Sequence, residues 1–212
     1  MKNHQNSLLD DVANYYKEKL EMYGDTPRGV DWNSSESQSI RFCQLNKLIN
    51  PETSNFSLND LGCGYGAFFE YLLAKYPLFS YSGIDISPQM ISAAQKRNGE
   101  NQKARFISAS EPDTISDYGV ASGIFNVRLD REDTEWYQYL QTTLDIMHSS
   151  SRLGFSFNCL TSYSDEEKKR DHLFYADPCR VFDLCKRRYS RQVALYHDYG
   201  LYEFTIVVRK ST

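Results

Sequence analysis

The chain is poor in the features that mark disulfide-bonded, metal-binding or membrane proteins. Its five cysteines are odd in number and form no Cys-x-x-Cys pair, so we expect neither a disulfide framework nor a zinc site. No apolar run approaches the length needed to cross a bilayer, and residues 1–6 lack the apolar core of a secretory signal. These absences predict a cytoplasmic protein with reduced thiols, no metal and no membrane partner.

Positive charge is also scarce. The 24 Lys and Arg residues are outnumbered by 28 Asp and Glu residues, which leaves a net charge of −4 and no broad basic face. Nucleic acid is therefore a poor candidate partner, because its binding rests on neutralising phosphates. The 212 residues suffice for one α/β domain with a sizeable core, but not for a second full domain. Aromatic residues reach 14%, which fits either an aromatic-lined pocket or ordinary core packing.

What the chain does have is a glycine-rich turn at residues 62–66. Gly62, Gly64 and Gly66 alternate, Asp60 stands two residues before the first, and a helical pattern of apolar residues follows at once. Glycine lacks Cβ, so it turns sharply and lets a ligand approach the backbone closely. Such a turn between a strand and a helix is a common nucleotide site, because free backbone N–H groups point at the ligand.

Two kinds of cofactor compete for this turn. Residues 62–67 satisfy the pattern Gly-x-Gly-x-x-Gly/Ala, which is compatible with NAD or FAD. The carboxylate of Asp60 beside the loop would repel an anionic pyrophosphate, whereas it would attract an ammonium group. S-adenosylmethionine carries an ammonium and a sulfonium group and no phosphate, so the charge argument favours it.

A second acid, Asp85, lies at the end of the next expected strand. Its distance from the glycine turn is the spacing of an acid that binds ribose hydroxyls in α/β nucleotide folds. Its two oxygens can accept from the 2′- and 3′-hydroxyls together, which excludes the 2′-phosphate of NADP. Ile86 is placed to lie against an adenine face. Ser87-Pro88 is typical of a helix start, with Ser87 as the N-cap.

The chain resembles the class I S-adenosylmethionine-dependent methyltransferases in three segments. These are Asp-Leu-Gly-Cys-Gly-Tyr-Gly at 60–66, Gly-Ile-Asp-Ile-Ser at 83–87 and the expected last strand at 204–210. The resemblance implies a sheet of strand order 3-2-1-4-5-7-6. Many relatives carry an Asp after the third strand that meets the adenine amino group. Residues 105–111 hold no Asp here, so we expect cofactor contacts from Ser108 and Ala109, with a serine hydroxyl, Glu111 or a backbone carbonyl meeting the amino group.

Strands and helices alternate along the chain from residue 56 onward. Predicted strands span residues 56–61, 80–85, 104–108, 120–125, 153–157, 191–196 and 202–208. Predicted helices span residues 67–76, 88–97, 133–148 and 177–186. This alternation predicts an α/β fold with a doubly wound, mostly parallel seven-stranded sheet whose last strand is antiparallel. We expect one domain over residues 1–212, in which residues 1–50 form a helical cap over the cofactor.

Candidate residues for the reacting site lie in this cap and near the carboxyl ends of the strands. Trp32 is placed to stack in the site or to anchor the cap. Arg41 is placed to pair with the methionine carboxylate, or to lie on a helix surface. His197 beside Asp198 is the best candidate for a general base, with an outward-facing turn as the alternative. Asn126 follows the expected fourth strand and would contact the cofactor or orient an acceptor.

The favoured interpretation is an enzyme that transfers the methyl group of S-adenosylmethionine to a small-molecule acceptor by in-line displacement. Three alternatives stay open. The first is an NAD-dependent oxidoreductase, which Asp60 and the terminal antiparallel hairpin disfavour. The second is a non-catalytic protein that binds S-adenosylmethionine without turnover. The third is a protein or RNA methyltransferase, which a basic patch on the catalytic face would favour. The sequence leaves the acceptor and the oligomeric state undecided.

Overall fold

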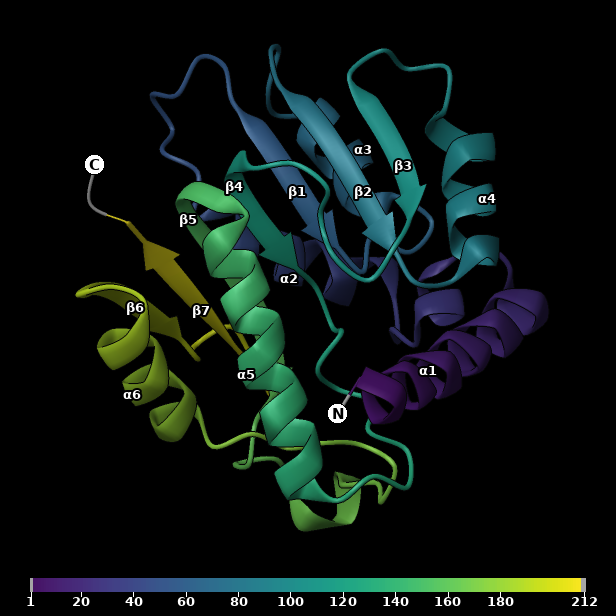
Figure 1. Ribbon diagram of the computed structural model, residues 1–212, viewed down its shortest axis with the longest axis vertical. Coiled ribbons are helices and arrows are strands. Elements are labelled where there is room, and N and C mark those ends of the chain that lie inside the picture. The colour runs from purple at the N-terminus through teal and green to yellow at the C-terminus, as the bar shows by residue number, and fades with distance from the viewer. Residues whose placement is uncertain (1, 211–212) are drawn as a thin grey trace.

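A seven-stranded sheet runs through residues 2–210, the part of the chain that the computed structural model describes (Figure 1). The strand order is β3-β2-β1-β4-β5-β7-β6, and β7 runs antiparallel to both of its neighbours. The predicted α/β class, strand order and antiparallel last strand are therefore confirmed. The strands are β1 (Ser57–Leu61), β2 (Ser80–Asp85), β3 (Ala104–Ser108), β4 (Ser116–Ala121), β5 (Ser151–Leu160), β6 (Gln192–Tyr196) and β7 (Glu203–Arg209).

Helices cover both faces of this sheet, as a largely parallel sheet requires. The helices are α1 (Lys2–Tyr23), α2 (Ser35–Asn46), α3 (Ala67–Leu73), α4 (Pro88–Asn98), α5 (Asp133–Ser149) and α6 (Pro178–Arg188). α5 and α6 pack on the front face in Figure 1, in a cluster that includes Trp136 and Phe157. α2, α3 and α4 share a second cluster, with Phe69 and Tyr81 at its centre. α1 instead lies beside the carboxyl ends of β2 and β3 (Figure 1).

The fourth strand ends earlier than its sequence predicts. The prediction of a strand at 120–125 was wrong, because the ladder of β4 with β1 and β5 ends at Ala121. Gly123 takes a φ of +80° and turns the chain over the edge of the sheet, and its N–H donates to Oδ1 of Asn158 at 2.8 Å. The two apolar residues that suggested a longer strand have other places: Ile124 lines a cavity, and Phe125 packs in the hydrophobic core.

Local capping signals predict the start of α4 correctly. Oγ of Ser87 accepts from the N–H of Met90 at 3.3 Å, and Pro88 is the first helical residue. The helix therefore begins three residues after β2 ends at Asp85, which keeps that carboxylate at the edge of the sheet. No helix within residues 2–210 combines the length and apolar character needed to span a membrane.

Candidate functional site

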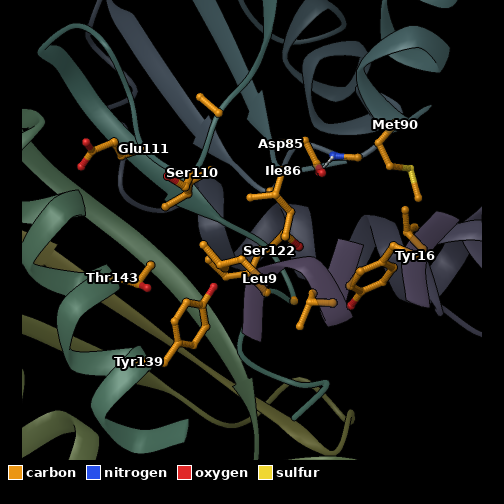
Figure 2. A pocket seen from close by; sticks show the side chains of 18 of the residues that line it. Leu9, Tyr16, Asp85, Ile86, Met90, Ser110, Glu111, Ser122, Tyr139 and Thr143 are labelled. Atoms are coloured by element: carbon orange, nitrogen blue, oxygen red, sulfur yellow. Dashed lines mark hydrogen bonds between the residues drawn. The ribbon is translucent and has the colours of Figure 1, made fainter. Parts of the chain in front are cut away.

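A cavity of about 520 Å³ lies at the carboxyl edge of the sheet, between α1 and α5. Its wall is built from the glycine turn, the ends of β2 and β4, the loop after β3 and these two helices. Figure 2 shows Tyr16 of α1 toward one side and Tyr139 and Thr143 of α5 toward the other, with Asp85 and Ile86 between them. The volume falls within the range of about 300–1,000 Å³ that is usual for small-ligand sites.

The glycine turn presents bare backbone to this cavity. Gly62, Gly64 and Gly66 have φ values of +75°, +54° and +86°, a region that side chains other than glycine rarely enter. Gly62 and Gly64 line the cavity, whereas Gly66 caps α3 and lies outside the lining. A Cβ added to Gly62 would stand 2.1 Å from Cγ2 of Ile124, so no side chain fits there.

Asp85 holds its carboxylate in place through two backbone groups. Oδ1 accepts from the N–H of Ser87 at 2.8 Å, and Oδ2 accepts from the N–H of Gly64 at 2.9 Å. Burial raises the pKa of this carboxyl, whereas the backbone hydrogen bonds lower it. Each oxygen keeps acceptor capacity beyond its one backbone bond, so the carboxylate can accept from two hydroxyl groups of a ligand in the cavity. Ile86 lies next to it in the lining.

The loop after β3 closes the part of the cavity that faces α5. Ala109, Ser110 and Glu111 line it. Ser108, the last residue of β3, is exposed and does not belong to the lining. The polar groups that this loop brings to the cavity are therefore those of Ser110, Glu111 and the backbone.

Asp60, which the sequence predicts to contact the cofactor, lies outside the lining of this cavity, and its cofactor contact stays a prediction. Successive residues of a strand face opposite sides of the sheet, and Leu61 takes the cavity side while Asp60 faces the other. The Tyr81 hydroxyl donates to its Oδ2 at 2.5 Å, and Oδ1 is buried without a partner. Burial, with a smaller contribution from the charge of Asp85, raises the pKa of Asp60 to about 7 against the opposing effect of the Tyr81 hydrogen bond. The carboxyl is therefore only partly ionised at neutral pH, and it stabilises the sheet interior in its protonated form.

Replacing Asp60 with asparagine is expected to flatten the pH dependence of stability between pH 4 and 7. The pKa of about 7 in the folded protein exceeds the ordinary 3.8, so the stability that Asp60 contributes is full at low pH and is lost as pH rises through 7. That loss amounts to at most about 4 kcal/mol. Urea unfolding of both proteins at pH 4, 5.5 and 7 measures it, and parallel curves for the two proteins would contradict the assignment.

Two helices contribute cavity residues that sequence reasoning did not assign to the site. α1 supplies Leu9 and Val12 beside Tyr16, and α5 supplies residues 139, 142, 143 and 146. The apolar stripe of α5 indicates that one face of the helix is buried. Periodicity does not show whether the protein core or a ligand covers that face. Burial raises the pKa of Tyr16 well above its usual value, with the charge of Asp31 adding to the shift, so its hydroxyl stays protonated at neutral pH.

A second cavity, of about 260 Å³, adjoins the first. Tyr16, Val30 and Trp32 line both cavities, so they form the wall that the two share. The rest of the second lining comes from the segment 160–175 and from Asp31, Asn33, Arg41, Asn126, Val127, Tyr202 and Glu203. The ring of Trp32 lies on Gly123, where an added Cβ would come within 2.5 Å of the indole. Trp32 therefore lies in the wall between the two cavities, a position that fits both of its sequence interpretations.

Arg41 forms a buried ion pair with Glu203, and the methionine carboxylate predicted as its partner stays a prediction. Its Nε donates to both oxygens of Glu203 at 2.8 and 2.9 Å, and Nη2 lies 2.7 Å from Oε1. The guanidinium also stacks on Trp32, 3.8 Å from the ring centroid. Oε2 of Glu203 accepts from Asn158, which binds Gly123 through its own oxygen. This chain of contacts fixes Trp32 and α2 to the end of the sheet.

Asn126 lines the second cavity and not the first, and its predicted contact with the cofactor stays a prediction. Its Oδ1 accepts from the N–H of Leu160 at 3.1 Å, which settles the orientation of the amide because a backbone N–H can only donate. The Nδ2 group makes no hydrogen bond to a residue that the structure describes, so it can donate to a ligand in the second cavity.

His197 and Asp198 line neither cavity, and the general base proposed for this pair stays a prediction. Both are exposed, and the imidazole packs on Tyr163 and Phe204 with centroid distances of 5.9 and 6.1 Å. The physical reason is the strand order, since β6 is the edge strand and the turn after it lies at the margin of the sheet. The pair is the outward-facing turn of the alternative interpretation.

Comparison with known sequences identifies similar proteins. A family model described as a methyltransferase domain matches residues 59–149. The chain is 61% identical over 157 residues to the putative methyltransferase Rv1506c of Mycobacterium tuberculosis, a match that covers 74% of this chain and 95% of that protein. It is 25% identical over 136 residues to malonyl-[acyl-carrier protein] O-methyltransferase of a Paenibacillus species, covering 63% of this chain and 48% of that one.

Solved structures share the fold at low sequence identity. Magnesium protoporphyrin IX methyltransferase of Synechocystis with bound S-adenosylhomocysteine superimposes with a TM-score of 0.68 at 12% identity, covering 98% of this chain and all of that one. The N-methyltransferase NodS of Bradyrhizobium japonicum, also with S-adenosylhomocysteine, gives a TM-score of 0.65 at 17% identity, covering 94% and 98%.

Proposed function

The chain belongs to the class I S-adenosylmethionine-dependent methyltransferases, and we propose that it methylates a small molecule bound in the second cavity. S-adenosylmethionine is the cofactor of this enzyme, and the first cavity is its proposed site. The observation that carries the proposal is the shared wall of Tyr16, Val30 and Trp32, because ligands of the two cavities would meet there. Membership of this family removes the dinucleotide oxidoreductase from consideration.

The residues of the first cavity fit this cofactor. Asp85 presents two oriented oxygens for the ribose hydroxyls, and Gly62 and Gly64 bring backbone without side chains to the lining. Ile86 supplies an apolar surface for adenine, with polar groups of Ser110 and Glu111 nearby in the lining. For the methionine end, the Oγ of Ser122 is buried without a partner and belongs to the same lining. We propose that Ser122 and the backbone of the glycine turn bind the ammonium and carboxylate groups in place of Asp60 and Arg41.

The protein's own contribution to catalysis is positioning. When bound, S-adenosylmethionine supplies a methyl group on a sulfonium, which is already a good leaving group. α1 and Trp32 cover the junction of the cavities and exclude water, and we propose that residues 1–50 act as a cap for this purpose. The Tyr16 hydroxyl remains protonated and can orient an acceptor by donating a hydrogen bond. The geometry favours acceleration by proximity and alignment, which can supply several orders of magnitude without a strong base.

A small acceptor fits the second cavity better than a macromolecule does. The cavity has about half the volume of the first and is bounded by α1, η1 (Pro27–Val30) and the segment 160–175. Magnesium protoporphyrin IX, the acceptor named for one structural neighbour, is likewise a small molecule.

Calorimetry and an acceptor screen test the proposal. The full chain is expected to bind S-adenosylmethionine and S-adenosylhomocysteine with a stoichiometry of one, and NAD not at all. A panel of small acceptors, followed by release of S-adenosylhomocysteine, is expected to reveal turnover. Binding of NAD alone would overturn the cofactor assignment. Cofactor binding without turnover on any acceptor would favour the non-catalytic alternative.

Replacing Gly62 with alanine is expected to destroy most cofactor binding and to destabilise the protein. A left-handed φ strains alanine by about 1–3 kcal/mol, and the new methyl group pushes Ile124 toward the cavity. Gly200→Ala is the matched control, because Gly200 has a φ of +72° and no atom within 4 Å of an added Cβ. Calorimetry with S-adenosylhomocysteine should separate the two variants. Equal loss of binding in both would show that backbone strain alone is responsible.

A further inference from the structure

We propose that the second cavity selects an acceptor that carries a carboxylate or phosphate group, and that Lys168 and Arg170 bind this group. The inference rests on the proposed function, since it assumes that the second cavity is the acceptor site. Both residues line the second cavity and neither lines the first. The anionic group would thus be held away from the cofactor, while the atom that receives the methyl group lies at the wall of Tyr16, Val30 and Trp32.

The charges around the cavity leave a positive excess. Its two acids are already neutralised: Asp31 accepts from Tyr15 at 2.7 Å and from Lys19 at 2.8 Å, and Glu203 is paired with Arg41. Lys168 and Arg170 form no ion pair with any residue that the structure describes. Two cationic side chains with no counter-charge on the cavity wall favour an anionic ligand, because charged donors make the stronger hydrogen bonds to carboxylate and phosphate.

The acids next to these residues in the chain do not cancel this excess. Glu166 is paired with Lys169 at 2.5 Å, and Asp165 accepts from the Tyr202 hydroxyl. None of the four acids of this segment belongs to the cavity lining, namely Asp165, Glu166, Glu167 and Asp171. The segment 165–171 therefore brings two of its three cations, Lys168 and Arg170, to the cavity, and none of its acids.

A second, independent observation concerns donors that lack acceptors. Arg41 is only 6% exposed and lines the cavity, and its Nη1 is buried without a hydrogen-bond partner. The Nδ2 of Asn126 in the same lining has no partner among the described residues. Buried donors are nearly always satisfied in native proteins, so an unpaired guanidinium nitrogen at a cavity indicates that the ligand brings an acceptor. An anionic group brings several.

The test uses three probes of similar shape: benzoate, phenyl phosphate and neutral benzamide. The full chain is first saturated with S-adenosylhomocysteine, whose own binding checks the proposed function separately. Titration is followed on the indole N–H resonance of Trp32, because the chain has two tryptophans and the other, Trp136, is buried with its Nε1 donating to Phe125. Benzoate or phenyl phosphate is expected to bind at least tenfold more tightly than benzamide, and the better of the two identifies the anion.

Single substitutions identify the residues that bind the anion. Lys168→Gln and Arg170→Gln are each expected to weaken the preferred anion about tenfold, without changing the affinity for S-adenosylhomocysteine. Lys169→Gln is the matched control, because it removes the same charge one residue away but outside the cavity lining. Equal binding of benzoate and benzamide, no binding of any probe, or equal loss in the Lys169 variant would overturn the proposal. Failure of S-adenosylhomocysteine to bind would instead overturn the proposed function.

Discussion

Asp85→Asn is expected to weaken S-adenosylmethionine binding by roughly a hundredfold. Both Asp85 oxygens face backbone N–H groups, so one end of an asparagine would place its own amide N–H against a donor. The variant also loses the negative charge that accepts from the two ribose hydroxyls. Charge-assisted hydrogen bonds contribute about 1.5–3 kcal/mol each, and a loss of about 3 kcal/mol corresponds to this change in affinity.

The measurement is calorimetric titration with S-adenosylhomocysteine, which does not react. Asp198→Asn is the matched control, since it makes the same chemical change at an exposed residue outside both cavities. Thermal unfolding of the free variant shows whether the titration is performed on folded protein. If the Asp85 variant binds within threefold of the native affinity, the ribose contact is not where the first cavity places it.

Glu203→Gln is expected to destabilise the protein by about 3–5 kcal/mol. The guanidinium of Arg41 would then be buried without a counter-charge, and removing one partner of a buried pair has this cost. Because Arg41 stacks on Trp32, we also expect the cofactor affinity to fall as the indole loses its support. Glu166→Gln is the control. It breaks an ion pair whose acid is 87% exposed, and such surface pairs contribute about 0–1 kcal/mol.

Urea unfolding of the two variants tests this difference, with the indole resonance of Trp32 as a local reporter. A double variant, Arg41→Met with Glu203→Leu, is expected to regain part of the lost stability, because replacing a whole buried pair by apolar residues is often neutral. Equal destabilisation by Glu203→Gln and Glu166→Gln would show that the pair does not anchor the N-terminal cap.

Predictions of backbone structure that depended only on residues close together in the sequence are confirmed. In the glycine turn, the three glycines of residues 62–66 take left-handed φ values. At Ser87-Pro88, the Ser87 hydroxyl oxygen accepts from the N–H of Met90 and caps the start of α4. The alternation of strands and helices gives the sheet its parallel order, because each crossover brings the chain back to the same edge. Where the outcome depended on more distant partners, as at residues 120–125, the prediction failed, since an apolar run looks the same in a strand and at a cavity wall.

The sequence by itself determined the family, the fold and the identity of the cofactor, because each depends on short motifs whose backbone and spacing are local. Only the tertiary structure decided which side chains reach the site. Asp60 faces Tyr81 on the other side of the sheet, and His197 lies beside an edge strand. Arg41 meets Glu203 across 162 positions of sequence. These contacts arise from the packing of strands and helices that are far apart in the sequence. A local sequence pattern therefore cannot predict which charged group a distant strand will bring to the cavity.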